Sequence, residues 1–444
     1  MATSRERQDP WKSDLTYIIG HQRPDVDAIA SAVGYAWHLH QMGQENVVAA
    51  RAGQVGSQAA FALGHFGLKP PRPLSSAAPT FAHIAQPQAP VAPYDPLAEA
   101  MARLAQGERL VPVVDGVGHL LGGLTPLGLA RAYAQVASGQ ARTSAQTCRT
   151  YVEQLPVLPA SDRVRDRRGA LLRGGGEEFL VVSEDGRYLG TTDRQRLLEP
   201  PRARLILVDH NELAQAVPGA DEAEIVGVLD HHRLGNAPTV APIPFVVEPV
   251  GSTSTLVAEA CRRQGVTPPG EIAGLLLSGI LSDTLVFRSP TVTERDRRAA
   301  EWLAELSGVV IPEYGQQLIK ASPGLADRSA DEIVEVDRKN YEMGGRAVSV
   351  AQVEVTGFQE LPERRADLLE ALDARRVREN LALICLMVTD VITIQSRLLC
   401  QGEPALLAGL PFNRVDPHEF DLGNIVSRKK QLIPALQGAL EEIE

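Results

Sequence analysis

Four separate segments of the chain place histidine or aspartate residues directly after apolar stretches. The run His21-Gln-Arg-Pro-Asp25-Val-Asp27 follows LTYIIG, and the pairs Asp209-His210 and His231-His232 follow RLILV and IVGVLD. Asp283 follows the apolar run LLLSGILS. These groups offer oxygen and imidazole ligands without thiolates, a set that suits Mn²⁺, with Co²⁺ or Fe²⁺ as alternatives, better than structural zinc. The predicted ligands of a two-metal site are His21, Asp25, Asp27, Asp209, His231 and Asp283.

Each segment also has a simpler interpretation. Asp25 or Asp27 could cap the following helix, and an aspartate at the end of a strand often forms a turn. Four element ends that all supply Asp or His favour the metal interpretation. Two metals about 3.5–4 Å apart lower the pKa of a water between them and hold both sides of a phosphoryl displacement. Asp209 is the predicted shared ligand.

The elements that carry these residues alternate between strands and helices. This alternation predicts an α/β fold with a doubly wound, mostly parallel sheet, whose strand ends form one ligand-binding edge. The predicted strands are 15–20, 46–50, 204–209, 225–230 and 244–248, and the predicted helices are 27–39, 58–66, 254–263 and 272–281.

The segment between residues 73 and 202 differs in composition and interrupts this pattern. Residues 70–96 are rich in Pro and Ala and are interpreted as a linker. Two similar strand–turn–strand–helix blocks follow at 110–130 and 179–198, each preceded by a helix, at 97–104 and 165–172. This repeat predicts a tandem pair inserted into a host domain.

A smaller α/β domain is predicted at the end of the chain, after a hinge at 322–328. Strands are expected at 346–355 and 382–389 with a helix between them, and the last element is 427–444. Its basic run Arg428-Lys429-Lys430 could be a solvated helix start, because cations are unfavourable at a helix N-terminus unless an anion binds there. The predicted domains are 1–72 and 203–322 (catalytic), 73–202 (inserted) and 323–444 (C-terminal).

Composition narrows the class of protein. With 444 residues the chain should form two to four domains. Its net charge of −11 argues against a nucleic-acid binder. The polar start, Met1 to Asp14, is expected to be disordered rather than a signal peptide, and no apolar run is long enough for a membrane helix. Four unpaired cysteines fit a reduced, cytoplasmic protein.

Six segments in order resemble the manganese-dependent, family II inorganic pyrophosphatases of the DHH phosphoesterase superfamily. These segments are GHQRPDVDAIASA, LVDHNE, VLDHHR, GSTST, SGILSDT and SRKKQLIPAL. The resemblance implies that His21 and Asp25 bind the first metal, that Asp27, His231 and Asp283 bind the second, and that Asp209 bridges them. It also implies two Mn²⁺ ions, with Co²⁺ possible, and additional Mg²⁺ that enters with pyrophosphate.

The resemblance further assigns substrate phosphates to His232, Lys339, Arg428 and Lys429, with Lys339 in the run Asp337-Arg-Lys-Asn-Tyr. Arginine grips phosphate with a bidentate fork and lysine acts as a point charge. In the expected reaction, a bridging hydroxide attacks phosphorus while Lys339, Arg428 and Lys429 stabilise the charge on the leaving and transferred groups. Asp209 takes part in catalysis as the ligand that bridges the metals. The C-terminal domain is expected to close over the site.

The inserted blocks resemble a CBS-domain pair, which implies regulation by AMP, ADP, ATP or diadenosine polyphosphates. The corresponding residues are Thr125 in the first block and Thr191 and Asp193 in the second. Gly128 and Gln195 stand where CBS units that bind nucleotide usually carry an acid. A dimerisation module without a ligand is therefore the alternative, and a homodimer is expected in either case.

Three other functions fit parts of the sequence. An exopolyphosphatase or short-chain polyphosphatase would share the metals and most cations. A DHH-type oligonucleotide phosphodiesterase would carry a glycine-rich GGGH-like segment, where this terminal domain has SRKK, and the 5% aromatic content offers little base stacking. A nucleotide-sensing protein with an inactive hydrolase domain would not need the complete ligand set.

Overall fold

The computed structural model describes residues 15–138, 147–235, 239, 241–322, 324–325, 328–355, 357–391 and 393–442. The start of the chain, predicted to be disordered, lies outside the described residues, as does part of the predicted hinge at 322–328. Among the described residues, no helix combines the length and the apolar composition needed to cross a bilayer.

The N-terminal domain is built on a six-stranded sheet of order β11-β10-β9-β1-β2-β3, in which every strand pairing is parallel. Its strands are β1 Thr16–Ile19, β2 Val47–Arg51, β3 Arg72–Pro73, β9 Arg204–Val208, β10 Glu224–Asp230 and β11 Phe245–Val247. Its helices are α1 Val26–Gln41, α2 Ser57–His65, η2 Ala220–Glu222, α8 Thr253–Arg263, α9 Gly270–Asp283, α10 Glu294–Ser307 and α11 Ile311–Lys320.

The central strands are apolar on both sides because both faces of this sheet are covered. Ile18 and Val208 pack with α1, α8, α9 and α10 on one face. Tyr17 and Leu207 pack on the other face against loop residues that include Leu74. The parallel sheet is confirmed, but helices cover one face and irregular segments cover the other, because the connection from β9 to β10 contains only the short turn η2.

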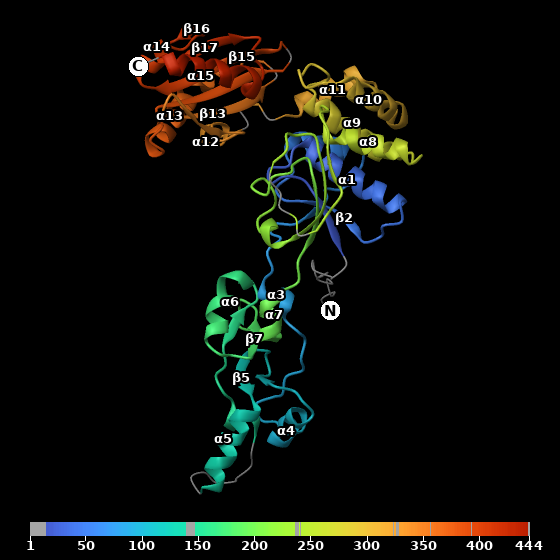
Figure 1. The fold of residues 1–444 in the computed structure, drawn as a ribbon, viewed down its shortest axis with the longest axis vertical. Coiled ribbons are helices and arrows are strands. Elements are labelled where there is room, and N and C mark those ends of the chain that lie inside the picture. The colour runs from blue at the N-terminus through green and yellow to red at the C-terminus, as the bar shows by residue number, and fades with distance from the viewer. Residues whose placement is uncertain are drawn as a thin grey trace.

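The chain leaves this domain after β3 and returns at β9, and the intervening unit extends away from the sheet and from the C-terminal domain (Figure 1). Its elements are α3 Phe81–Ile84, α4 Leu97–Ala105, β4 Val111–Val114, β5 Leu120–Leu124, α5 Pro126–Ala137, η1 Cys148–Tyr151, β6 Val157–Pro159, α6 Val164–Arg173, β7 Glu178–Val182, β8 Tyr188–Asp193 and α7 Arg194–Leu198. They form a two-stranded sheet, β4-β5, and a three-stranded sheet, β6-β7-β8, each with a core of its own.

The interpretation of residues 70–96 as a linker is wrong. Phe81, Ile84 and Val91 are fully buried in the two cores of the inserted unit. The backbone of this segment also pairs with later strands, for example at Gln86 with Thr191. Its composition resembles that of a linker, but its few apolar side chains are enough to anchor it.

Two arginines attach the inserted unit to the N-terminal domain. Arg163 Nη2 lies 2.5 Å from Glu222 Oε1, and Arg165 Nη1 lies 2.7 Å from Asp221 Oδ2. Nearby, the Ala77 amide donates to the Pro218 carbonyl. These contacts end on the connection between β9 and β10, which also carries Asp209.

The C-terminal domain has a mixed sheet of order β12-β13-β14-β15-β17-β16. Its elements are α12 Ala330–Ile333, β12 Lys339–Met343, β13 Arg346–Val355, α13 Leu361–Arg378, β14 Leu383–Asp390, β15 Gln395–Gly402, α14 Pro404–Ala408, β16 Asn413–Asp416, β17 Glu419–Gly423, the π-helical turn η3 Arg428–Leu432, and α15 Ile433–Glu442. Leu368 of α13 and Leu436 of α15 belong to the cores on opposite faces of the sheet. The domain contacts the N-terminal domain where the Arg23 Nη1 donates to the Glu335 carbonyl, 3.2 Å away.

Candidate metal centre

The six predicted ligands lie together at one edge of the parallel sheet. His21 follows β1, Asp209 follows β9, His231 follows β10, and Asp283 is the last residue of α9. Potential ligand atoms fall within 4.8 Å of one another in three groups: one joins His232 to Asp209 and His231, and the other two consist of predicted ligands alone. Of these last two groups, one is His21, Asp25 and Asp209, and the other is Asp27, Asp209, His231 and Asp283. Both groups contain Asp209, as the predicted shared ligand would.

Asp209 lies at the centre of this cluster and is almost fully buried. Its Oδ2 is 3.5 Å from His21 Nε2, and its Oδ1 is 3.3 Å from His231 Nε2. Its backbone has a φ of 62°, in the left-handed region that Asp and Asn tolerate better than most residues. The sharp turn at the end of β9 therefore directs one carboxylate between two imidazoles.

Asp25 combines the two roles that the sequence left open. Its Oδ1 accepts a hydrogen bond of 2.9 Å from the Ala28 amide and caps α1. Its Oδ2 lies 3.4 Å from His21 Nε2. One oxygen of this carboxylate thus fixes the helix while the other faces the candidate ligands.

Asp27 is buried and is held by the N-terminus of α8. Its carboxylate accepts hydrogen bonds from the Ser252 hydroxyl, 2.7 Å, from the Thr253 amide, 2.6 Å, and from the amide and hydroxyl of Ser254. Backbone amides at a helix N-terminus favour an anion, so this contact keeps Asp27 in place.

The run Ser252-Thr-Ser-Thr255 belongs to the GSTST segment, and each of its members donates a hydrogen bond to a buried carboxylate. Besides the contacts with Asp27, the Thr253 hydroxyl donates to Asp209 Oδ1 at 3.1 Å. The Thr255 hydroxyl donates at 2.6 Å to the buried Asp296, which also accepts from the Gly251 amide. A Ser/Thr-rich run directly before a helix is a capping signal, and it could have pointed to these positions.

Removing the Thr253 hydroxyl should weaken metal binding. Thr253→Val keeps the shape of the side chain but leaves Asp209 without this donor. Partners of metal ligands of this kind usually contribute about 10–100-fold in metal affinity or activity. Titration of Mn²⁺ into the metal-free variant should show a loss of that size, whereas Thr253→Ser, which keeps the donor, should stay near the parent. Equal affinities for all three proteins would contradict the assignment.

A second buried carboxylate orients His232. Asp230 Oδ1 lies 2.9 Å from His232 Nδ1 and accepts from the amides of His231 and His232. Asn211 Nδ2 donates to the other oxygen of Asp230 at 2.5 Å. Because Asp230 engages Nδ1 of His232, the Nε2 atom of this ring remains available for another partner.

The electrostatics of the cluster fit divalent cations. Burial opposes the charged form of Asp209, yet its contacts with His21 and His231 hold its pKa well below the usual range. Burial lowers the pKa of His231, but Asp209 outweighs this effect and raises it to about 10. Burial raises the pKa of Asp27 to about 7, and the charge of Asp209 adds to the rise. Protons therefore balance the carboxylates in the metal-free chain.

Two atoms of the cluster lack hydrogen-bond partners. Among the described residues, Asp209 Oδ2 and His231 Nε2 are buried without a partner of hydrogen-bond geometry. A buried polar atom without a partner is costly, so each of these atoms needs a ligand. The oxygen and imidazole donor set suits Mn²⁺, and the residues present therefore fit a pair of such ions.

The four predicted substrate residues differ in their availability. Lys339 and Lys429 are exposed, and His232 is about half exposed. Burial and the charges of Arg233 and Lys339 lower the pKa of Lys429, which places these cations near one another. Arg428 is different, because it is only 5% exposed and contacts Asp337 within its own domain.

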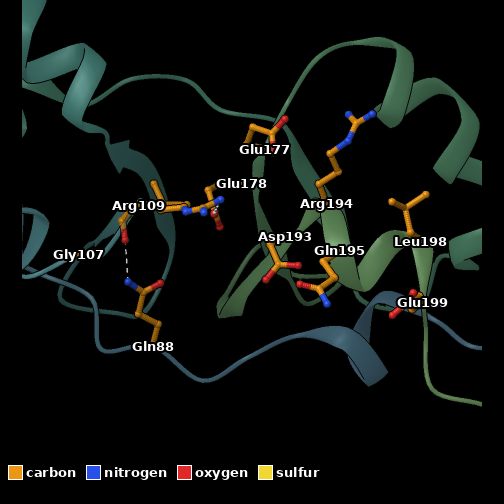
Figure 2. A pocket seen from close by; sticks show the side chains of 11 residues that line it. Gln88, Gly107, Arg109, Glu177, Glu178, Asp193, Arg194, Gln195, Leu198 and Glu199 are labelled. Carbon is orange, nitrogen blue, oxygen red and sulfur yellow. Dashed lines mark hydrogen bonds and ion pairs between the residues drawn. The ribbon is translucent and has the colours of Figure 1, made fainter.

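The predicted nucleotide residues of the inserted unit contact other protein groups. The Thr125 hydroxyl donates to Glu153 at 2.5 Å, and the Thr191 hydroxyl donates to Gln88 at 3.0 Å. Asp193 caps α7 and also borders a cavity of about 560 Å³ between the two blocks (Figure 2).

This cavity carries more negative than positive side chains. Its acidic residues are Glu177, Glu178, Asp193 and Glu199, and its basic residues are Arg109 and Arg194. Arg109 lies 3.8 Å from Glu178, beside it in Figure 2. Burial and the charge of Asp193 raise the pKa of Glu178. A ligand with many negative charges would meet repulsion here.

Two family models match this chain. Residues 15–280 match the N-terminal domain of the DHH family, and residues 316–439 match the DHHA2 domain. The chain is thus a protein of the DHH type.

Two curated relatives narrow the class further, and one solved structure shares the fold. A "Probable manganese-dependent inorganic pyrophosphatase" of Streptococcus suis (strain 98HAH33) is 39% identical over 281 residues, which are 62% of this chain and 89% of the relative. A protein of the same description from Streptococcus equi subsp. zooepidemicus (strain H70) is 41% identical over 236 residues, 53% of this chain and 76% of the relative. A solved structure described as "Crystal structure of Methanococcus jannaschii putative family II inorganic pyrophosphatase" shares the fold with a TM-score of 0.58 and 24% identity, and the match covers 96% of this chain and 99% of that one. The chain belongs to the manganese-dependent inorganic pyrophosphatases of the DHH family.

Proposed function

We propose that this chain hydrolyses inorganic pyrophosphate to two phosphates with the help of two Mn²⁺ ions. The observation that carries the proposal is the pair of ligand groups that share the buried Asp209. His21 and Asp25 would complete the first metal site, and Asp27, His231 and Asp283 the second. Cations of the C-terminal domain, among them Lys339 and Lys429, supply the charge that a pyrophosphate would need.

Side chains around the metals bind and orient the substrate. When bound, the metals lower the pKa of water and polarise the phosphoryl group. His232, fixed through Nδ1 by Asp230, presents Nε2 to a phosphate oxygen. Lys339 and Lys429 neutralise the charge on the leaving phosphate, and Arg428 joins them once its contact with Asp337 is released. Thr253 keeps the Asp209 carboxylate in position throughout.

Phosphate release by the purified chain tests this function. Removal of divalent ions with a chelator should abolish turnover of pyrophosphate, because the carboxylates and imidazoles would then carry protons in place of metals. Mn²⁺ should restore it, in the presence of Mg²⁺ for the substrate, and Co²⁺ should restore it in part. Tripolyphosphate in a parallel assay distinguishes a polyphosphatase. Faster release from tripolyphosphate, or full activity after chelation, would refute the proposal.

The inserted unit is proposed to be a CBS pair that regulates the enzyme by binding an adenine nucleotide. The two blocks, each a short sheet with helices, and the cavity between them support this role. Thr191 and Asp193 lie at this cavity or next to it, whereas Thr125 lies at the equivalent position of the other block. The salt bridges of Arg163 and Arg165 would connect the unit to the β9–β10 connection that begins at Asp209.

Calorimetric titration should detect this ligand and should show how the affinity depends on the charge of the nucleotide. Since acidic side chains outnumber basic ones in the cavity, AMP should bind more tightly than ADP, and ADP more tightly than ATP or a diadenosine polyphosphate. Pyrophosphatase activity should change over the same concentration range, as linkage between two sites requires. Inorganic phosphate serves as the control ligand, because it should bind only the catalytic centre. If titration gave no heat and the activity did not change, the regulatory role would be refuted and the inserted unit would be a dimerisation module.

We also propose that the protein is cytoplasmic and that it forms a homodimer. The four cysteines are buried and unpaired, which supports a reducing cytoplasmic environment. Exposed apolar side chains on the inserted unit, among them Tyr94, Val117, Leu127 and Tyr133, support a homodimer formed through that unit.

A further inference from the structure

A single carboxylate contacts two of the cations that were predicted to bind substrate. Asp337 Oδ2 lies 2.7 Å from Arg428 Nη2, and Asp337 Oδ1 lies 3.8 Å from Lys339 Nζ. The Arg428 Nη1 also donates to the Asp337 and Val350 carbonyls. Protein groups therefore engage Nη1 and Nη2 of Arg428, whereas its buried Nε has no partner among the described residues, and Asp337 takes the place that an anionic ligand would occupy.

The position of Arg428 requires an anion. It is the first residue of η3, directly after Ser427, whose side chain accepts from the Lys430 amide. Arg428 is buried, and a buried guanidinium is costly unless an anion pairs with it. The carboxylate of Asp337 supplies the missing negative charge.

The backbone of Asp337 adopts a special conformation to make this contact. Its φ is 45°, in the left-handed region, where only a few per cent of residues other than glycine are found. Its side chain stays 54% exposed, although Arg428 itself is buried. The carboxylate could therefore leave Arg428 and be solvated by water without unfolding the domain.

Asp337 lies close to the contact between the two domains. Arg23, in the segment that carries His21, Asp25 and Asp27, donates through Nη1 to the carbonyl of Glu335, 3.2 Å away and two residues before Asp337. This part of the C-terminal domain therefore faces the segment that supplies three of the predicted metal ligands.

We propose that Asp337 is a positioning residue that orients the side chains of Arg428 and Lys339 in the free enzyme and competes with pyrophosphate for them. The inference rests on the proposed function, since it concerns the substrate of that same site. Pyrophosphate brings more negative charge than one carboxylate and can displace it. Asp337 would then weaken the binding of substrate and of product phosphate, which favours release of product after each turnover.

Two substitutions remove the carboxylate and keep the backbone conformation. Asn tolerates the left-handed region, and Gly adopts it freely. Asp337→Asn and Asp337→Gly should each bind methylenediphosphonate, a pyrophosphate analogue that is not hydrolysed, at least about fivefold more tightly in the presence of Mn²⁺, the size expected for loss of one competing charged contact. The KM for pyrophosphate should fall in parallel, without a rise in kcat. Asp331→Asn, which removes the same charge from the exposed first turn of α12, should leave affinity and KM unchanged.

A double-mutant cycle shows whether the effect passes through Arg428. Arg428→Lys should weaken analogue binding more in the Asp337→Asn background than in the parent, because in the parent the analogue must first break the contact of Arg428 with Asp337, which offsets part of the gain. Equal losses in both backgrounds, weaker binding by Asp337→Asn, or failure of both Asp337 variants to fold would overturn the inference. Parent protein that does not hydrolyse pyrophosphate would instead refute the proposed function, so the two failures are distinguishable.

Discussion

Asp209→Asn should abolish pyrophosphate turnover and leave the fold intact. The substitution replaces the one carboxylate that belongs to both ligand groups with a neutral amide. Neither metal site would keep its full charge, and the effect on kcat/KM should be at least about a thousandfold, which exceeds the loss of a single transition-state donor. Asn has nearly the shape of Asp and tolerates the φ of 62°, so the turn after β9 should persist.

Three measurements distinguish loss of the site from loss of the fold. Phosphate release reports turnover, elemental analysis reports the number of Mn²⁺ ions per chain, and thermal unfolding reports the fold. The number of bound ions should fall below two while the unfolding temperature stays near that of the metal-free parent. Asp185→Asn, in an exposed turn of the inserted unit, should change none of the three. Near-normal hydrolysis by Asp209→Asn would rule out the shared-ligand assignment.

Gly279→Ala should disrupt the metal centre although it adds only one methyl group. Gly279 lies inside α9, four residues before Asp283. A Cβ atom there would lie 2.4 Å from the Ser254 hydroxyl and 2.7 Å from Asp27 Oδ1, closer than atoms can approach. Either α9 must shift, which moves Asp283, or the contacts with Asp27 must break. Overpacking of this kind costs about 1–3 kcal/mol of stability, and Mn²⁺ affinity should fall by about 10–100-fold.

A second helical glycine provides the matched control. Gly438 in α15 is exposed, and a Cβ built there meets no atom within 4 Å. Gly438→Ala should stabilise the chain by about 0.5–1 kcal/mol, because alanine is the better helix former, and Mn²⁺ binding should not change. If the two variants bound Mn²⁺ alike, the close approach of α9 to α8 would have no bearing on the metal centre.

The sequence predicts the centre well where ligands follow local patterns. The strands before His21, Asp209 and His231 are short apolar runs, and the helix that ends at Asp283 is apolar from Ile272 to Leu281 except at Ser278. Parallel strands present their carboxyl ends at one edge, so residues distant in sequence could be expected to meet. The structure brings all six residues together, and their roles as ligands remain a prediction.

Features that depend on tertiary contacts could not be predicted. The burial of Arg428 arises from Asp337, which is far from it in sequence, and a basic run alone indicates an exposed surface. The sequence does not predict helices α10 and α11 or strands β15 to β17; α10 is rich in charged residues, and β16 and β17 are only 4 and 5 residues long. The segment 70–96 looked like a linker because few of its side chains are large, although those few are buried.

The insertion between β3 and β9 delays the pairing of β1 with β9 during folding. Strand β1 pairs with β2 on one side and with β9 on the other, so one edge of the central strand stays open until the ribosome has completed the inserted unit. The Ser252–Asp27 hydrogen bond spans 225 residues, and closing so long a loop from a disordered chain costs entropy. Because the inserted unit has cores of its own, it can fold first and bring its two ends together, which shortens the effective loop. The folding rate of the catalytic sheet should therefore depend on the stability of a unit that supplies none of the six metal ligands.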